Sequence, residues 1–320
     1  MKALRRLVIL LAALVSMTIC LRGGKTQVPP GKEVRKEGFY IVNRGTIRSL
    51  DLDENDMMAL VYDLDEIPGF ASQGTIIELN VGGDRERGGL ESRLIRVWRG
   101  REHKVSLHIE CIVCQAKESA QAWLEAILKY SSAAPMFKQG SFSGLPLGDK
   151  CWRNSSANTL FFTVGRVFVI VQVLGPKEMN GLFAEALSVG IEYSIRLHPK
   201  KLAEVPKPLS VLVSNQPVAR GKAVALVGVV VAPISALEPA QVSIRTNRTK
   251  KEWTVTASRN GRWVRLEAFS WEMETDKGKV KLERPVFPYK GELIVPLRQV
   301  AEALGIVFHQ RGQTIALMAK

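Results

Sequence analysis

Residues 291–305 have the sequence GELIVPLRQVAEALG, which is the most regular pattern in the chain. Its apolar run predicts a buried strand over 293–298. The apolar residues that follow are spaced three and four apart, as on one face of a helix, and predict a helix over 299–304. Gly305 stands where a left-handed residue ends a helix. The stretch therefore predicts a strand that passes directly into a short amphipathic helix.

The residues on either side of this stretch extend it into a small folded unit. Before it, 280–287 is extended in character, and a turn is expected at 290–291. After it, the apolar runs 306–308 and 314–317 flank an Arg-Gly turn, which predicts a closing hairpin. The sequence thus predicts a compact β-α-β-β unit at the C-terminus.

Residues 291–305 closely resemble the signature of the copper amine oxidase-like N-terminal domain, a stalk module of bacterial surface proteins. We assign this resemblance to 253–320. It implies a non-catalytic accessory module on an exported protein. In the oxidases of that name, the copper histidines and the tyrosine-derived quinone belong to a different domain, which no part of this chain resembles.

The N-terminus has the layout of a signal peptide, with Lys2, Arg5 and Arg6 before an apolar run at 7–19. That run is shorter than a membrane-spanning helix requires. Cys20 follows it, but Ile19 stands where a lipid-anchor site normally has a small residue. We predict an exported chain of the cell envelope, periplasmic or extracellular, and leave cleavage, lipidation at Cys20 and retention as a membrane tether as alternatives.

Composition describes a globular and strongly basic chain. Of its 320 residues, 46% are hydrophobic and 24% are charged, and the formal net charge is +14. On an exported protein this charge favours contact with anionic envelope polymers. The alternative is that the basic residues only form a solvated surface. The partner we expect is a cell-envelope component or another envelope protein, and no nucleic acid is expected in that compartment.

Shifts in pattern divide the chain into six segments. They are a signal peptide or anchor at 1–20, a linker at 21–37, an α+β domain with an antiparallel sheet at 38–198, a proline-containing linker at 199–210, a β-rich segment at 211–252, and the C-terminal module at 253–320.

Within the α+β domain, alternating and helical patterns follow one another. They predict strands at 75–81, 93–98, 105–113, 160–162, 167–173 and 191–197, a short helix near 53–63, and longer helices around 120–128 and 179–187. From residue 105 onward this gives the order β-α-β-β-α-β, which is the split arrangement of ferredoxin-like domains.

Cys111 and Cys114 form a C-x-x-C pair at a predicted strand-to-helix junction. Thioredoxin-like proteins place a reactive pair there, so thiol-disulfide redox activity is an alternative function. A structural disulfide that involves Cys151, or buried free thiols, would explain the same cysteines without a redox activity.

The predicted loop at 131–156 carries three spaced glycines but matches no nucleotide-binding motif. Phe142, Asp149 and Trp152 would line it if the loop formed the lip of a ligand site. The alternative is a connecting loop that its aromatic residues hold in place.

Two further groups of residues suggest metals only superficially. Asp51, Asp53, Asn55 and Asp56 begin like a calcium loop, but the glycine and glutamate of that motif are missing, so they predict a helix cap. His103 and His108 are expected to point to opposite faces. We therefore predict no metal site, no cofactor and no catalytic residue. The function that the sequence favours is binding or scaffolding in the envelope.

Overall fold

The structure is a computed structural model. It describes residues 32–36, 39–43, 50, 52–62, 67–79, 90–100, 105–131, 134–175, 181–204, 208–213, 216–218 and 223–319. The predicted signal segment with Cys20 lies outside the described residues, as do Asp51 and His103. No helix in the described ranges is both long enough and apolar enough to cross a membrane.

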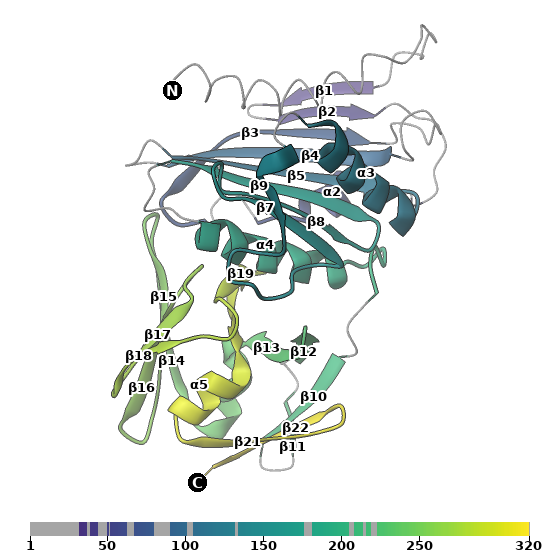
Figure 1. Cartoon of the computed structure of the whole chain (residues 1–320). Helices are drawn as coiled ribbons and strands as arrows, with labels where there is room; N and C mark the ends of the chain where they lie inside the picture. The colour runs from purple at the N-terminus through teal and green to yellow at the C-terminus, as the bar shows by residue number, and fades with distance from the viewer. Residues whose placement is uncertain are drawn as a thin grey trace, which may run out of the picture.

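The N-terminal half of the described chain is built on one large sheet, in the spatial order β1-β2-β3-β4-β5-β9-β8-β7-β6. The strands are β1 (Lys32–Lys36), β2 (Phe39–Asn43), β3 (Phe70–Leu79), β4 (Leu90–Gly100), β5 (Ser106–Cys114), β6 (Phe137–Gln139), β7 (Lys150–Asn154), β8 (Thr159–Val164) and β9 (Val167–Leu174). Neighbours pair antiparallel, except that β2 and β3 are parallel. Figure 1 shows this sheet in the upper half of the molecule.

Helices cover both faces of the sheet. α3 (Lys117–Tyr130) packs on one face through Ala120 and Leu124. α4 (Gly181–Arg196) packs on the other, and the short α2 (Glu54–Met58) adds Met57 to the same side. Both faces of the central strands are apolar because each is covered, which explains the continuous apolar runs in β8 and β9.

The C-terminal half contains two more sheets within the described residues. An eight-stranded sheet comprises β10 (Pro208–Val213), β11 (Gln216–Pro217), β12 (Ala223–Leu226), β13 (Val229–Pro233), β19 (Phe287–Tyr289), β20 (Glu292–Pro296), β21 (Ile306–Arg311) and β22 (Thr314–Ala319). A five-stranded antiparallel sheet comprises β14 (Ser243–Arg248), β15 (Trp253–Arg259), β16 (Arg262–Glu267), β17 (Glu272–Thr275) and β18 (Gly278–Lys281). The 3-10 helix η3 (Ile234–Ala240) and α5 (Leu297–Ala303) pack against these sheets.

Most of the predicted elements are confirmed. The described residues are mostly β, with antiparallel sheets and few helices. At the C-terminus, β20 passes directly into α5, Gly305 takes a φ of +74°, and β21 and β22 form the closing hairpin. The predicted helix cap also forms, because Asp53 and Asp56 each accept a hydrogen bond from the backbone N–H of the other.

The predicted strand at 191–197 is wrong, because these residues form the second half of α4 and the turn after it. Apolar residues alternate at Ile191, Tyr193 and Ile195, which is a strand period. They are helical nonetheless, because α4 is enclosed on several sides and can carry apolar residues all around. The split β-α-β-β-α-β order is therefore not confirmed. The predicted loop at 131–156 also contains β6 and β7, and β1 lies within the segment assigned to the first linker.

One of the three hydrophobic clusters of the described residues connects the two halves. Leu187 and Ile191 of α4 belong to the same buried cluster as Phe269, Phe287 and Ile294 from the C-terminal half. The boundary expected between residues 252 and 253 falls between β14 and β15, which pair along their whole length. In Figure 1, α4 lies between the large sheet above and β19 below.

Candidate functional site

The junction around α4 holds the most unusual side chains of the described structure. Every residue from 184 to 195 is buried, and this run includes Glu185 and Glu192. A helix in a two-layer domain normally exposes one face to water. α4 lacks such a face here because the sheet covers one side and β19 covers another.

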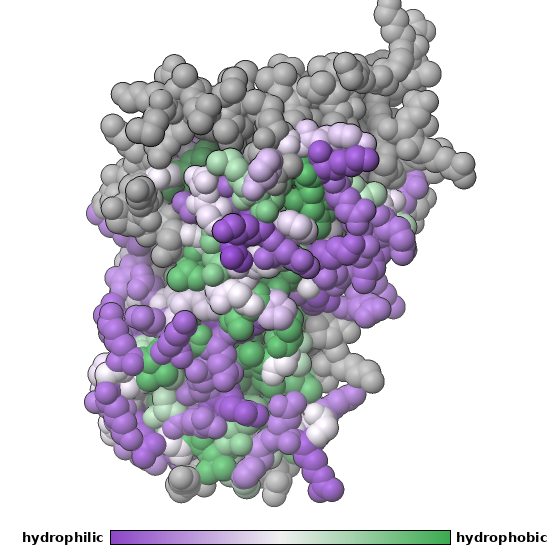
Figure 2. All heavy atoms as spheres, in the orientation of Figure 1, coloured by the Kyte–Doolittle hydropathy of each residue, from purple (hydrophilic) through white to green (hydrophobic). Residues whose placement is uncertain are grey.

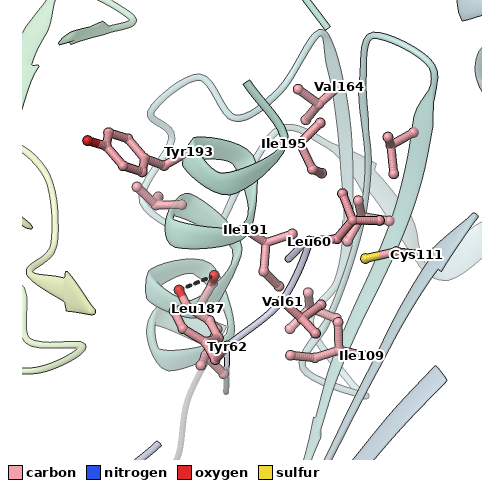
Figure 3. Close-up of a cluster of buried hydrophobic side chains, with 14 of the residues drawn as sticks. Leu60, Val61, Tyr62, Ile109, Cys111, Val164, Leu187, Ile191, Tyr193 and Ile195 are labelled. Atoms are coloured by element: carbon pink, nitrogen blue, oxygen red, sulfur yellow. Dashed lines mark hydrogen bonds between the residues drawn. The ribbon is translucent and has the colours of Figure 1, made fainter. Parts of the chain in front are cut away.

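At Gly190, Tyr62 from the N-terminal half and Phe287 from the C-terminal half both lie against α4. A Cβ atom at this position would overlap the Tyr62 hydroxyl oxygen and lie 3.1 Å from a ring carbon of Phe287. The Tyr62 hydroxyl donates a hydrogen bond of 2.7 Å to the carbonyl oxygen of Leu187 (Figure 3). The edge of its ring meets Phe269 at a centroid distance of 5.2 Å. Because Gly190 has no side chain, the Tyr62 hydroxyl and the Phe287 ring can both pack against α4 at this point.

Aromatic rings continue the junction toward the end of α4. Tyr193 meets Phe287 and Tyr289 edge to face, at centroid distances of 5.3 and 4.9 Å. Burial raises the pKa of Tyr193, which keeps its hydroxyl protonated. At the other end of the helix, the Trp271 indole N–H donates to the carbonyl oxygen of Leu182 at 3.0 Å. The two edge-to-face pairs of Tyr193 each contribute about 0.5–1.5 kcal/mol beyond the area that they bury.

Three buried charged residues and one exposed serine meet at this junction, and we call them the α4 polar cluster: Glu185, Glu192, Arg284 and Ser143. Glu185 and Glu192 are seven residues apart and share a face of the helix. The backbone N–H of Ser143 donates to Glu185 Oε2 at 2.7 Å, and its hydroxyl donates to Oε1. Arg196 binds Glu192 Oε1 at 2.8 Å.

Arg284 brings a positive charge into the cluster from the C-terminal half. It is 1% exposed, and its Nη2 donates to the carbonyl oxygen of Pro146 at 2.9 Å. Burial lowers its pKa, and the negative charges of Glu192 and Glu185 act in the opposite direction. Within the described residues, Arg284 Nε and Nη1 and Glu192 Oε2 have no hydrogen-bond partner. A buried charge is costly without compensation, so Arg284 and the two carboxylates stabilise one another across the junction.

The three residues predicted to line a ligand loop do not converge. Phe142 packs toward α4, where its ring fills the space beside Gly181. Trp152 lies on β7 rather than in a loop, and it packs on the opposite face of the sheet, in the cluster beneath α3. The structure therefore separates the two aromatic residues by the thickness of the sheet.

Asp149, the third of these residues, links three elements. Its carboxylate accepts the backbone N–H of Gly165 at 3.0 Å. Lys117, at the start of α3, lies 3.1 Å from it, and Arg196, at the end of α4, lies 3.5 Å from it. These contacts hold the end of the loop against the β8–β9 turn.

The three described cysteines are buried free thiols. Cys111 faces α4 and Cys114 faces α3, because they lie three apart on β5 and side chains alternate along a strand. Cys151 lies on β7, which β9 and β8 separate from β5, a distance of about 14 Å at normal strand spacing. That separation is too long for a disulfide. This arrangement disfavours the thiol-disulfide alternative.

Burial also keeps these thiols protonated. It raises the pKa of Cys114 and of Cys151 to about 12, and it raises that of Cys111 as well. At about pH 8 the thiolate fraction falls roughly tenfold for each unit by which the pKa rises. We expect iodoacetamide to modify the three thiols at least a hundredfold more slowly in the native chain than in urea, as measured by peptide mapping. Rapid modification of Cys111 and Cys114 in the native chain would restore the redox alternative.

Two of the histidines take part in the packing of the N-terminal half. His108 lies on β5, and burial lowers its pKa. The Nε2–H of His198 donates a hydrogen bond of 2.9 Å to the carbonyl oxygen of Asp56. No group of three His, Cys, Asp or Glu side chains in the described ranges lies close enough to hold a metal ion.

Sequence reasoning missed the α4 polar cluster. Glu185 and Glu192 stand among apolar residues in the sequence of α4. That pattern could have indicated two buried carboxylates whose charge another residue must compensate. Their partner Arg284 lies 92 residues after Glu192 in the sequence, so no local pattern could connect them.

These features define a β-rich protein whose C-terminal module is docked on a buried helix of the preceding part. Residues 223–317 match the family model described as the copper amine oxidase N-terminal domain. The match confirms the resemblance and begins 30 residues before the expected start at 253, in agreement with the pairing of β12, β13 and β20 in one sheet. No curated protein and no solved structure matches the chain. The one histidine of the matched region, His309, is exposed on β21, so this module does not fit a copper site.

Proposed function

We propose that this chain is an exported cell-envelope protein that binds or supports another envelope component and does not catalyse a reaction. The observation that carries the proposal is the docking of the family-matched module onto α4. Phe269, Phe287 and Ile294 of that module belong to the core of the preceding part. A module held in this way cannot swing on a linker, so its outer surfaces keep a fixed orientation relative to the large sheet.

The polar groups of the junction support a scaffolding role. Arg284, Glu185 and Asp149 are engaged in contacts that connect one element of the chain to another. The basic residues and apolar run at the N-terminus support export. In this proposal the N-terminal segment delivers or tethers the chain, and the docked halves form the part that meets the partner.

Fractionation of cells that produce the native chain tests the assignment to the envelope. We expect the protein in the envelope or secreted fraction, and we expect its intact mass to show cleavage near Cys20, lipid on Cys20, or a retained N-terminal tether. A variant with Arg5→Glu and Arg6→Glu reverses the charge before the apolar run, and we expect it to accumulate in the cytoplasm. Cys20→Ser separates the lipid from simple cleavage. A native chain that remains full-length in the cytoplasm would contradict the proposal.

A further inference from the structure

The α4 polar cluster contains hydrogen-bonding atoms that the folded chain leaves unpaired. Of the guanidinium nitrogens of Arg284, Nη2 donates to the carbonyl oxygen of Pro146. Its Nε and Nη1 have no partner among the described residues, and neither has Oε2 of Glu192. Both side chains are 1% exposed, so bulk solvent does not reach these atoms. Buried polar atoms without a partner are rare in folded proteins, and each one requires an explanation.

The opposite charges of the cluster lie near one another without direct contact. In the part of the chain that the structure describes, Arg284 forms no ion pair with Glu185 or Glu192, so its nitrogens lie more than 4.0 Å from their carboxylate oxygens. Burial lowers the pKa of Arg284, and the charge of Glu192 is the largest influence that opposes this shift. The two groups therefore sense each other across a short gap. Polar atoms separated in this way are commonly bridged by water.

Segments from both halves of the chain surround this gap. Glu185 and Glu192 come from α4, Pro146 from the loop before β7, and Arg284 from the segment between β18 and β19. Cys151 of β7 lies close by, because both glutamates add to the effect of burial in raising the pKa of its thiol to about 12. Figure 2 shows packed side chains at the level of the molecule where Figure 1 places α4.

The unpaired atoms determine which kind of molecule fits between them. Arg284 offers N–H donors and Glu192 offers an acceptor, so a bridging molecule must accept on one side and donate on the other. The two carboxylates would repel an anion, and Arg284 would repel a cation. A small neutral molecule with both functions satisfies these conditions. Water is that molecule, and buried water typically forms about three hydrogen bonds to such groups.

We propose that buried water links Arg284 to Glu192 at the junction between the two halves of the chain. The Nε–H and Nη1–H groups point in different directions from the planar guanidinium, so roughly one or two water molecules are needed. The water is then part of the interface on which the family-matched module docks. The inference depends on the structure of the junction alone, and it holds whatever the compartment or partner of the protein.

A high-resolution crystal structure of the full chain tests the proposal directly. We expect a water peak about 2.7–3.2 Å from Arg284 Nε or Nη1, and a water peak at the same distance from Glu192 Oε2. Direct contact between Arg284 and Glu192 at that distance would overturn the proposal. So would a junction without any water peak near these atoms.

Oxygen-17 magnetic relaxation dispersion provides a second test in solution, because it counts long-lived internal waters. The double variant Arg284→Met, Glu192→Met replaces both charged groups by apolar ones, a change that buried ion pairs often tolerate. We expect it to lose roughly one or two long-lived waters relative to the native chain. Arg298→Met, at an exposed position of the same module, should lose none.

The circular dichroism spectrum shows whether the double variant keeps the native fold. An equal number of long-lived waters in the native chain and in a folded double variant would contradict the proposal. If the double variant does not fold, the crystal structure of the native chain decides. Neither result bears on the fractionation experiment, because the junction is the same in every compartment.

Discussion

Replacing Gly190 by alanine is expected to destabilise the protein by about 3 kcal/mol, although alanine is the better helix former. In an exposed helix the same change would stabilise by about 1 kcal/mol. Here the added methyl group would overlap the Tyr62 hydroxyl oxygen and press on Phe287. Overpacking of this kind costs roughly 1–3 kcal/mol. Displacing Tyr62 would also break its buried hydrogen bond to Leu187, for about 1 kcal/mol more.

Urea unfolding followed by circular dichroism measures this effect. Tyr62→Phe supplies the matched control, because it removes the atom nearest to the added methyl group. In that background Gly190→Ala should cost less than it does alone, so the two changes should show a coupling energy in a double-mutant cycle. A gain in stability from Gly190→Ala in the native background would mean that Tyr62 and Phe287 do not pack against Gly190 as described.

Replacing Arg284 by methionine is expected to destabilise the protein by roughly 3 kcal/mol, because it removes the positive charge that faces Glu185 and Glu192. Both carboxylates are at most 1% exposed, so water cannot replace that charge. The bond to the Pro146 carbonyl oxygen is lost as well.

Arg298→Met is the matched control for this prediction. It removes the same charge from the same module, but Arg298 is exposed and lies over the Phe308 ring. We expect a change within about 0.5 kcal/mol for this surface substitution. If both variants lost the same small amount, the α4 polar cluster would contribute nothing to the junction.

The elements that the sequence predicted well are those that local patterns determine. The strand, helix and glycine at 291–305 follow from residue spacing and from the left-handed conformation at Gly305. The cap at Asp53 depends on residues three apart in the chain. Such signals need no knowledge of distant contacts.

The predictions that were wrong concern features that depend on packing between distant segments. The second half of α4 has a strand period, and only the modules around it explain why it is helical. Phe142 and Trp152 were grouped because they lie near one another in sequence, but β7 directs Trp152 to the opposite face of the sheet. Cys111 and Cys114 lie on opposite faces of the sheet because β5 continues through Cys114, whereas the sequence predicted the pair at the junction with the helix.

The central claim is that the family-matched module and the preceding part fold as one unit around α4. Segment-resolved hydrogen exchange during urea unfolding tests it most directly, because it reports each half of the chain separately. We predict that amides of β5, α4 and β20 lose protection in one transition with a common midpoint. Two transitions with separate midpoints, one for residues 50–204 and one for 223–319, would contradict the shared core.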